Sequence, residues 1–198
     1  MIKKLKNPQS KVYRGFKDII FNMGFDWYYL NSVNENQKDF DPEKNNDFGF
    51  YVHPLIARPK PGEFYHSKEV SKHVDHAEIL VHEILKANSL KAELFYRMSL
   101  NCTHPTGIDM YSPPHVDHCF PHHNMLIYLS DTYGGDTLVG DEKHIGMEDD
   151  IIIFPGDVEH CHKPPLKGRR IVLVTTMLPL SLKIDVSFIA LRCIKVYL

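Results

Sequence analysis

Two residues with metal-binding side chains, His115 and Asp117, stand two positions apart, and a third, His160, follows much later in the chain. On an extended segment, side chains two positions apart point to the same face, so one strand could offer His115 and Asp117 to a single ion. The third ligand must then come from another strand, and the turn-forming pair Pro155-Gly156 could deliver His160 there. Two histidines and a carboxylate leave three positions open on a non-haem Fe(II) ion. The trio therefore predicts a fold in which separate strands meet around a metal.

An arginine follows at a position that suits this chemistry. Arg170 stands ten residues after His160 and opens the apolar run 170–174. A fixed cation there could hold the far carboxylate of a keto acid that lies against the metal. Arg169 could take this role instead, but the Gly-x-Arg spacing and the start of a strand favour Arg170. This order of residues is typical of an oxygenase.

Other side chains compete for the metal, because the chain contains 13 histidines. The main rival of His160 is His162, which would share its face on an extended segment. The turn placement favours His160. Without a metal, these histidines would simply be solvated surface residues. The further candidates in this region are His118, His122 and His123, together with Cys119 and Cys161, although thiolates would favour zinc over iron.

Composition limits the class of protein. The chain has 198 residues, of which 43% are hydrophobic, and a formal net charge of −2. That length and composition favour one domain with a sizeable core, and the charge argues against general nucleic-acid or anionic-membrane binding. No secretory signal is recognised, and the apolar run 186–198 is too short and too interrupted by charge for a membrane span. The four cysteines form no Cys-x-x-Cys pair, so we expect a soluble, intracellular protein with reduced thiols.

The two halves of the chain differ in pattern. Residues 67–87 are predicted as a helix, because Ser67 is a suitable N-cap and apolar residues recur at helical spacing. Earlier in the chain, the aromatic residues 27–29 are more typical of a core than of a substrate-binding wall. The segment 31–46 is predicted as a polar loop. Pro54 and the prolines after it are expected to break regular structure. From Lys91 onward, short apolar runs are separated by turn residues such as Gly134-Gly135. The predicted strands are 94–100, 125–129, 137–139, 151–154 and 170–177.

These elements predict a mainly β fold, a jelly roll or small barrel with flanking N-terminal helices. The motifs are His-x-Asp, Tyr-Leu-Ser at 128–130, Gly-Gly-x-Thr at 134–137, Phe-Pro-Gly before His160, and Gly-x-Arg ending at Arg170. With them, the region 97–179 resembles the 2-oxoglutarate- and Fe(II)-dependent dioxygenases of the prolyl-4-hydroxylase-like branch, especially compact members encoded by bacteria and phages. The resemblance implies a double-stranded β-helix.

The same resemblance implies roles for individual residues. His115, Asp117 and His160 would be the catalytic iron ligands, and Arg170 would bind 2-oxoglutarate. Collagen-type prolyl hydroxylases have a lysine where Arg170 stands, so the chain is more similar to the arginine-using members. Tyr128 matches a strand tyrosine that donates to the same carboxylate, although a packed core aromatic is the alternative. The further candidates for the cosubstrate pocket are Thr137, Thr176 and Asn124.

The expected protein is one oxygenase domain over 1–198, with a helical and irregular support (1–92), a β-helix core (93–180) and a C-terminal extension (181–198). Its cofactors would be Fe(II), 2-oxoglutarate and O2, and it would hydroxylate a small-molecule or peptidyl substrate. Asp117 fills the position at which halogenating relatives carry a small residue, which favours hydroxylation. A cytoplasmic location follows, with phage origin and oligomeric state left open. The alternatives are a cupin-like metal-binding isomerase or binding protein without O2 chemistry, and a noncatalytic jelly-roll module.

Overall fold

The computed structural model describes residues 1–32, 48–59, 68–107 and 109–179. Within these ranges the helices are α1 (Lys11–Ile20) and α2 (Val74–Ala87). Neither of these two helices has the length and apolar composition that crossing a membrane requires. The strands, in chain order, are β1 (Lys3–Lys4), β2 (Tyr28–Leu30), β3 (Phe50–Ala57), β4 (Lys68–Glu69), β5 (Ala92–Thr103), β6 (His123–Tyr128), β7 (Thr137–Val139), β8 (Glu142–His144), β9 (Ile151–Pro155), β10 (His160–His162) and β11 (Arg170–Pro179).

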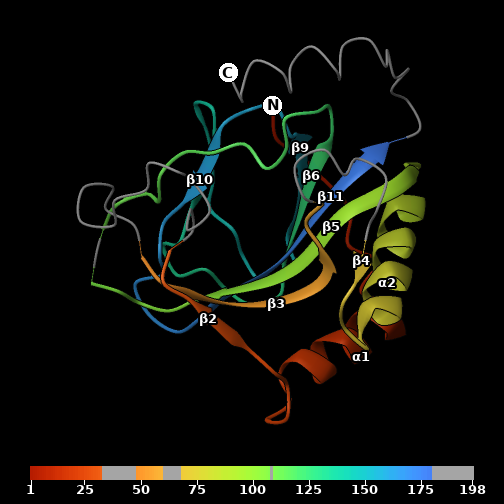
Figure 1. Cartoon of the computed structure of the whole chain (residues 1–198), viewed down its shortest axis with the longest axis horizontal. Coiled ribbons are helices and arrows are strands. Elements are labelled where there is room, and N and C mark those ends of the chain that lie inside the picture. The colour runs from red at the N-terminus through yellow and green to blue at the C-terminus, as the bar shows by residue number, and fades with distance from the viewer. Residues whose placement is uncertain (33–47, 60–67, 108, 180–198) are drawn as a thin grey trace.

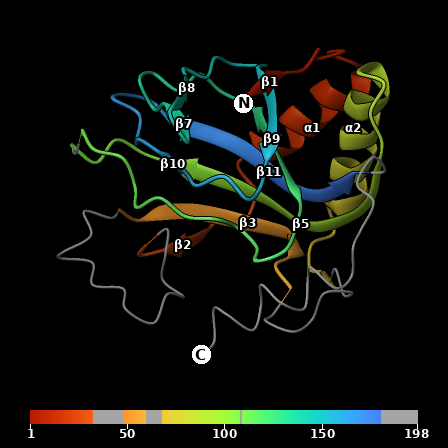
Figure 2. The same cartoon turned by 90° about the horizontal axis from the view of Figure 1, so that it is seen from above.

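The strands form two antiparallel sheets. The larger sheet has the order β1-β9-β6-β11-β5-β3-β2, with β4 paired to β3, and the smaller has the order β10-β7-β8. The last strand, β11, lies between β5 and β6, which precede it in the chain (Figure 1). Helices α1 and α2 lie on one side of the long strands β5 and β11, and β7, β8 and β10 lie on the other (Figure 2).

Both faces of the large sheet are buried at its central strands, because the side chains there alternate between two cores. On β6, Met125 and Ile127 belong to the core that also contains the buried residues of α1 and α2. The intervening Leu126 and Tyr128 belong to a second core, which they share with Val139 of the small sheet. This alternation is the period of two that a strand imposes. The predicted mainly β fold with flanking helices is confirmed, and the five predicted strands correspond to β5, β6, β7, β9 and β11.

The predicted helix at 67–87 was wrong at its start. Lys68 and Glu69 form β4, which pairs with the end of β3, and the helix begins at Val74 with His73 as the N-cap residue. Ser67 lies outside the described residues. Pairing with β3 therefore determines the conformation of this segment, although the apolar spacing correctly predicted the buried face of α2. That face consists of Val74, Ala77, Leu80, Val81, Ile84 and Leu85.

Two expectations about the first third of the chain were also wrong. Pro54 does not break regular structure: it lies inside β3, where the pairing with β5 shifts register between Pro54 and Ile56. A strand tolerates proline at such an irregularity, because the missing N–H is not needed there. Tyr28 and Tyr29 were expected in the core, but they are 58% and 57% exposed, since β2 is the edge strand of the large sheet. Most of the predicted polar loop at 31–46 lies outside the described residues.

Candidate metal centre

Backbone pairing brings the first and last of the three predicted ligands together. His115 forms an isolated antiparallel bridge with His160, at the start of β10. Their N–H groups donate to each other's carbonyl oxygens at 3.1 and 3.0 Å. Residues that exchange both hydrogen bonds present their side chains next to each other on the same face. The two imidazole rings accordingly lie with their centroids 4.6 Å apart.

The third predicted ligand, Asp117, completes the group. Within the described ranges, His115, Asp117 and His160 form the one cluster of histidine, cysteine or acidic residues that could hold a metal, with ligand atoms all within 4.8 Å of one another. Nε2 of His160 lies 3.3 Å from Oδ2 of Asp117. Metal bonds of about 2.1 Å place adjacent ligand atoms about 3 Å apart, so this pair is already close to the spacing of a coordination sphere.

The histidines are oriented by backbone carbonyls. Nδ1 of His115 faces the carbonyl oxygen of Pro113 at 3.3 Å, and Nδ1 of His160 faces that of Val158 at 3.2 Å. Such a contact fixes the tautomer in which Nδ1 carries the proton and Nε2 keeps its lone pair for a metal. Burial, followed by the proximity of His160, lowers the pKa of His115 to about 4, so this imidazole is neutral at physiological pH. Both features suit metal ligands.

Asp117 is buried, and three groups donate to its carboxylate. Oδ1 accepts from Arg58 at 2.6 Å and from Arg97 at 2.8 Å, while Oδ2 accepts from the amide of Asn124 at 3.1 Å and faces His160. Burial would raise the pKa of Asp117, but the charges of Arg97 and Arg58 oppose it and hold the pKa well below its usual range. Asp117 is therefore ionised, with Oδ2 directed at the cluster.

Three of the four rival histidines have other partners. Nε2 of His162 lies 3.3 Å from the hydroxyl of Thr103, although His162 lines the same cavity as the three ligands. His118 is hydrogen-bonded through Nε2 to Thr176 at 2.8 Å, and Nδ1 of His122 faces a carbonyl oxygen. Neither these three nor His123 belongs to the metal-ligand cluster.

Arg170 lines the same cavity as the three ligands. The cavity is lined by Phe50, Arg58, Arg97, Asn101, His115, Asp117, Leu126, Thr137, His160, Cys161, His162, Arg170, Val172 and Val174. The guanidinium of Arg170 donates from Nε to the carbonyl of Gly135 at 3.1 Å and from Nη2 to the hydroxyl of Thr137 at 2.9 Å. Arg169, in contrast, is exposed, and its guanidinium lies over the ring of Phe21, 5.8 Å from the centroid. The structure thus turns Arg170, and not Arg169, toward the ligands.

Tyr128 and Thr137 support this arginine. The Tyr128 hydroxyl lies 2.7 Å from that of Thr137, and the Arg170 guanidinium lies 5.5 Å from the centroid of the Tyr128 ring. Burial raises the pKa of Tyr128, so the phenol keeps its proton. The three residues form one hydrogen-bonded group beside the cavity.

The other two candidates, Thr176 and Asn124, have contacts in a different part of the site. Thr176 bonds His118, and Asn124 bonds Asp117. Both lie on paired positions of β11 and β6. Their contacts are with the carboxylate ligand and its neighbour, not with Arg170.

Sequence reasoning missed two residues of the site, Arg58 and Arg97. A signal existed for Arg97, because polar residues at 97, 99 and 101 alternate with apolar ones along β5 and so share one face. No comparable signal marked Arg58, which follows β3 and meets Asp117 only through the tertiary fold.

Comparison with known proteins gives structural likenesses only: no protein-family model and no curated protein matches the sequence. The fold is similar to a prolyl hydroxylase from Trichoplax adhaerens in complex with a hypoxia inducible factor peptide fragment (TM-score 0.58, 12% identity, 96% of this chain and 86% of that one). It is also similar to an oxidoreductase of the 2OG-Fe(II) oxygenase family from Burkholderia pseudomallei (TM-score 0.56, 12% identity, 83% and 76%).

A third similar structure is the non-haem alpha-ketoglutarate-dependent carbocyclase SnoK from nogalamycin biosynthesis (TM-score 0.53, 9% identity, 89% and 79%). At these identities the likeness concerns the fold. The chain has the double-stranded β-helix fold of the 2-oxoglutarate oxygenases, as the resemblance implied.

Proposed function

We propose that this protein is an Fe(II)- and 2-oxoglutarate-dependent dioxygenase that hydroxylates a C–H bond of its substrate. The observation that supports this most strongly is the convergence of His115, Asp117 and His160 in a cavity that Arg170 also lines. In the overall reaction, the substrate C–H, 2-oxoglutarate and O2 give the alcohol, succinate and CO2. When bound, Fe(II) supplies the activation of O2, which protein side chains cannot perform.

The residues of the chain have distinct roles in this proposal. His115 and His160 would offer Nε2 to the metal, because their Nδ1 atoms face carbonyl oxygens. Asp117 would offer Oδ2, since Oδ1 is engaged by Arg58 and Arg97. These contacts preorganise the three side chains that would hold the metal, and 2-oxoglutarate and O2 would take the coordination positions that the protein leaves open.

Arg170 would bind the far carboxylate of 2-oxoglutarate. A guanidinium matches a carboxylate in shape and charge, and burial away from water strengthens the pair. The Tyr128 phenol could add a neutral hydrogen bond without adding charge. A cupin-like isomerase or a metal-binding module would have no need for this buried cation beside the metal ligands, which is why we favour the oxygenase.

We further propose that residues 1–198 act as one oxygenase domain in the cytoplasm, on a small-molecule or peptidyl substrate. The prolyl hydroxylase with a similar fold is a complex with a peptide fragment, which makes a peptide one substrate class to test.

The test is anaerobic reconstitution with Fe(II) and 2-oxoglutarate, followed by admission of O2 and measurement of succinate across a broad substrate panel. We expect substrate-stimulated succinate release that is abolished in Asp117→Gly, which removes one of the three ligands. If the protein binds metal tightly but the whole panel gives no succinate, the cupin-like interpretation is favoured instead.

A further inference from the structure

Two arginines converge on the carboxylate of the candidate metal centre. Arg97, on β5, and Arg58, just after β3, both donate to Oδ1 of Asp117, and Arg58 also donates to its backbone carbonyl at 3.1 Å. Within the described part of the chain, Asp117 is the one acceptor of either guanidinium. Two positive charges therefore share one negative charge.

The cavity as a whole carries an excess of positive charge. Its lining includes the guanidinium groups of Arg58, Arg97 and Arg170, and among the described residues that line it only Asp117 is acidic. Three cations against one anion leave two positive charges. A divalent metal would add two, and doubly charged 2-oxoglutarate would remove two, so the loaded site would still carry two positive charges.

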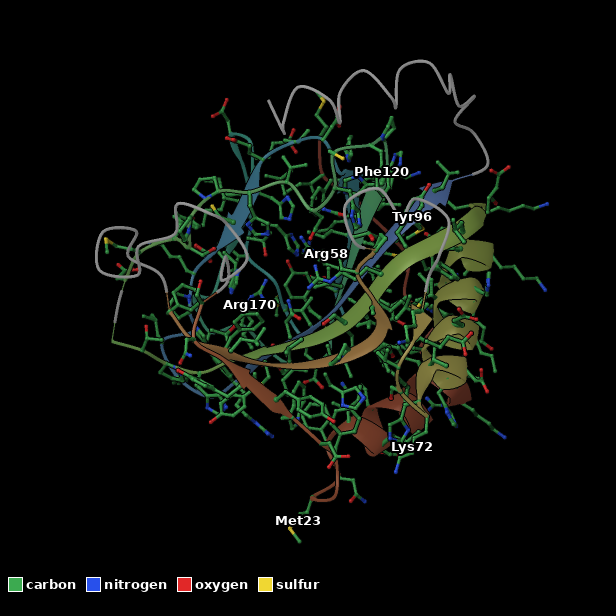
Figure 3. All side chains as sticks on the ribbon, in the orientation of Figure 1. Met23, Arg58, Lys72, Tyr96, Phe120 and Arg170 are labelled. Carbon is green, nitrogen blue, oxygen red and sulfur yellow. The ribbon has the colours of Figure 1, made fainter. Side chains whose placement is uncertain are left out.

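The arginine pair is costly without a further anion. Both guanidiniums lie within 2.8 Å of the same oxygen, Oδ1 of Asp117, and the Arg97 side chain is only 15% exposed, so water screens the repulsion between the two cations poorly. One arginine would be enough to hold Oδ1 of Asp117. The side chain of Arg58 is 46% exposed and lines the cavity, where the N–H groups that do not bond Asp117 can reach an incoming molecule (Figure 3).

We propose that Arg58 and Arg97 bind an oxyanion of the substrate, a carboxylate or a phosphate, which makes the substrate a small anionic molecule. This inference rests on the proposed function. Both guanidiniums contact Asp117, a candidate metal ligand, so an anion bound on their open sides would lie close to the metal. Only a few bonds of the substrate would then separate its oxyanion from the carbon that reacts at the metal. An internal prolyl residue of a peptide, which is neutral, would leave the two charges uncompensated.

Manganese-loaded protein saturated with 2-oxoglutarate provides the test. Paramagnetic Mn(II) accelerates the nuclear relaxation of small molecules bound near it, so no reaction and no knowledge of the true substrate is needed. The probes are acetate, its neutral analogue acetamide, inorganic phosphate, and a peptide with an internal proline. Acetate and phosphate distinguish the two sources of the oxyanion.

We expect acetate or phosphate to show relaxation that saturates with concentration, and acetamide to show none. Arg58→Gln and Arg97→Gln should each weaken anion binding about tenfold or more, because glutamine can still donate to Asp117 but lacks the charge. Arg14→Gln, on the exposed face of α1, is the matched control and should leave anion binding unchanged.

Four results would overturn the inference: equal relaxation of acetate and acetamide, anion binding that survives in both variants, relaxation of the peptide alone, or no anion binding at all. Anion binding that survives in both variants would mean direct coordination of the anion to manganese. Metal and 2-oxoglutarate affinities are measured on the same samples. If the wild type fails to bind these two, the proposed function itself is wrong, whereas their normal binding without anion binding refutes only the oxyanion site.

Discussion

Replacing Arg170 with alanine deletes the cation that we assign to the far carboxylate of 2-oxoglutarate. The side chain is 4% exposed, so its pairing with a carboxylate would take place largely away from water. A hydrogen bond to a charged group contributes about 1.5–3 kcal/mol. Because about 1.4 kcal/mol corresponds to a tenfold change in affinity, Arg170→Ala should weaken 2-oxoglutarate binding by about 10- to 150-fold.

The assay is calorimetric titration of 2-oxoglutarate into zinc-loaded protein, since zinc holds the ligand without supporting O2 chemistry. Zinc affinity itself should change little, because Arg170 is not a metal ligand. The substitution also leaves the Gly135 carbonyl without its donor, so thermal unfolding should be recorded to confirm that the variant is folded. Arg170→Lys, which keeps the charge but loses the planar fork, should fall between alanine and wild type.

Arg169→Ala is the matched control, because this exposed neighbour is directed at Phe21 rather than the cavity. It should bind 2-oxoglutarate as the wild type does. If Arg169→Ala is impaired and Arg170→Ala is not, the assignment of the cosubstrate anchor is wrong.

Three further predictions follow from individual contacts. Tyr128→Phe removes one neutral hydrogen bond to Thr137 and should weaken 2-oxoglutarate binding only about three- to tenfold in the same titration. An effect as large as that of Arg170→Ala would contradict the roles assigned to the two residues. Gly146→Ala should lower the unfolding temperature, because a Cβ there would lie 2.4 Å from the Tyr128 ring, whereas Gly15→Ala in helix α1, with no atom within 4 Å, should be neutral or stabilising. Burial lowers the pKa of both His122 and His144, so the folded protein takes up protons at these histidines less readily than the unfolded chain, whose histidines titrate near pH 6.5. The free energy of unfolding of metal-free protein should therefore fall as the pH drops below about 6.5. Denaturant titrations that show rising stability over this range would refute the prediction.

The β core was predictable because its signals are local. Short apolar runs bounded by glycine and proline turns identified β5, β6, β7, β9 and β11, and each run carries its own evidence in a few residues. The spacing of His115 and Asp117 is equally local, since two positions on an extended chain fix a shared face.

The first third of the chain was predicted less well, for two different reasons. Helix α1 had a local signal that went unused: Ser10 caps it by accepting from the N–H of Tyr13, and Tyr13, Phe16 and Ile20 recur at helical spacing on its buried face. Strand β3 had no such signal, because Pro54 argues against a strand until the register shift opposite β5 is known.

The arginines of the site show the limit of sequence reasoning. Arg58 meets Asp117 across 59 positions of the chain, and only the pairing of β3 with β5 brings it there. Charged residues near a strand end are usually solvated, so nothing in the sequence distinguished Arg58 from a surface cation. The ligand trio followed from spacing and turns, whereas the charge around it depended on the tertiary fold.

A crystal structure of the protein with Mn(II) and 2-oxoglutarate, solved without O2, tests the central claim most directly. We predict manganese bound by Nε2 of His115, Oδ2 of Asp117 and Nε2 of His160, with the far carboxylate of 2-oxoglutarate on the Arg170 guanidinium. Manganese bound through His162, or 2-oxoglutarate held by Arg58 and Arg97 instead of Arg170, would contradict the account.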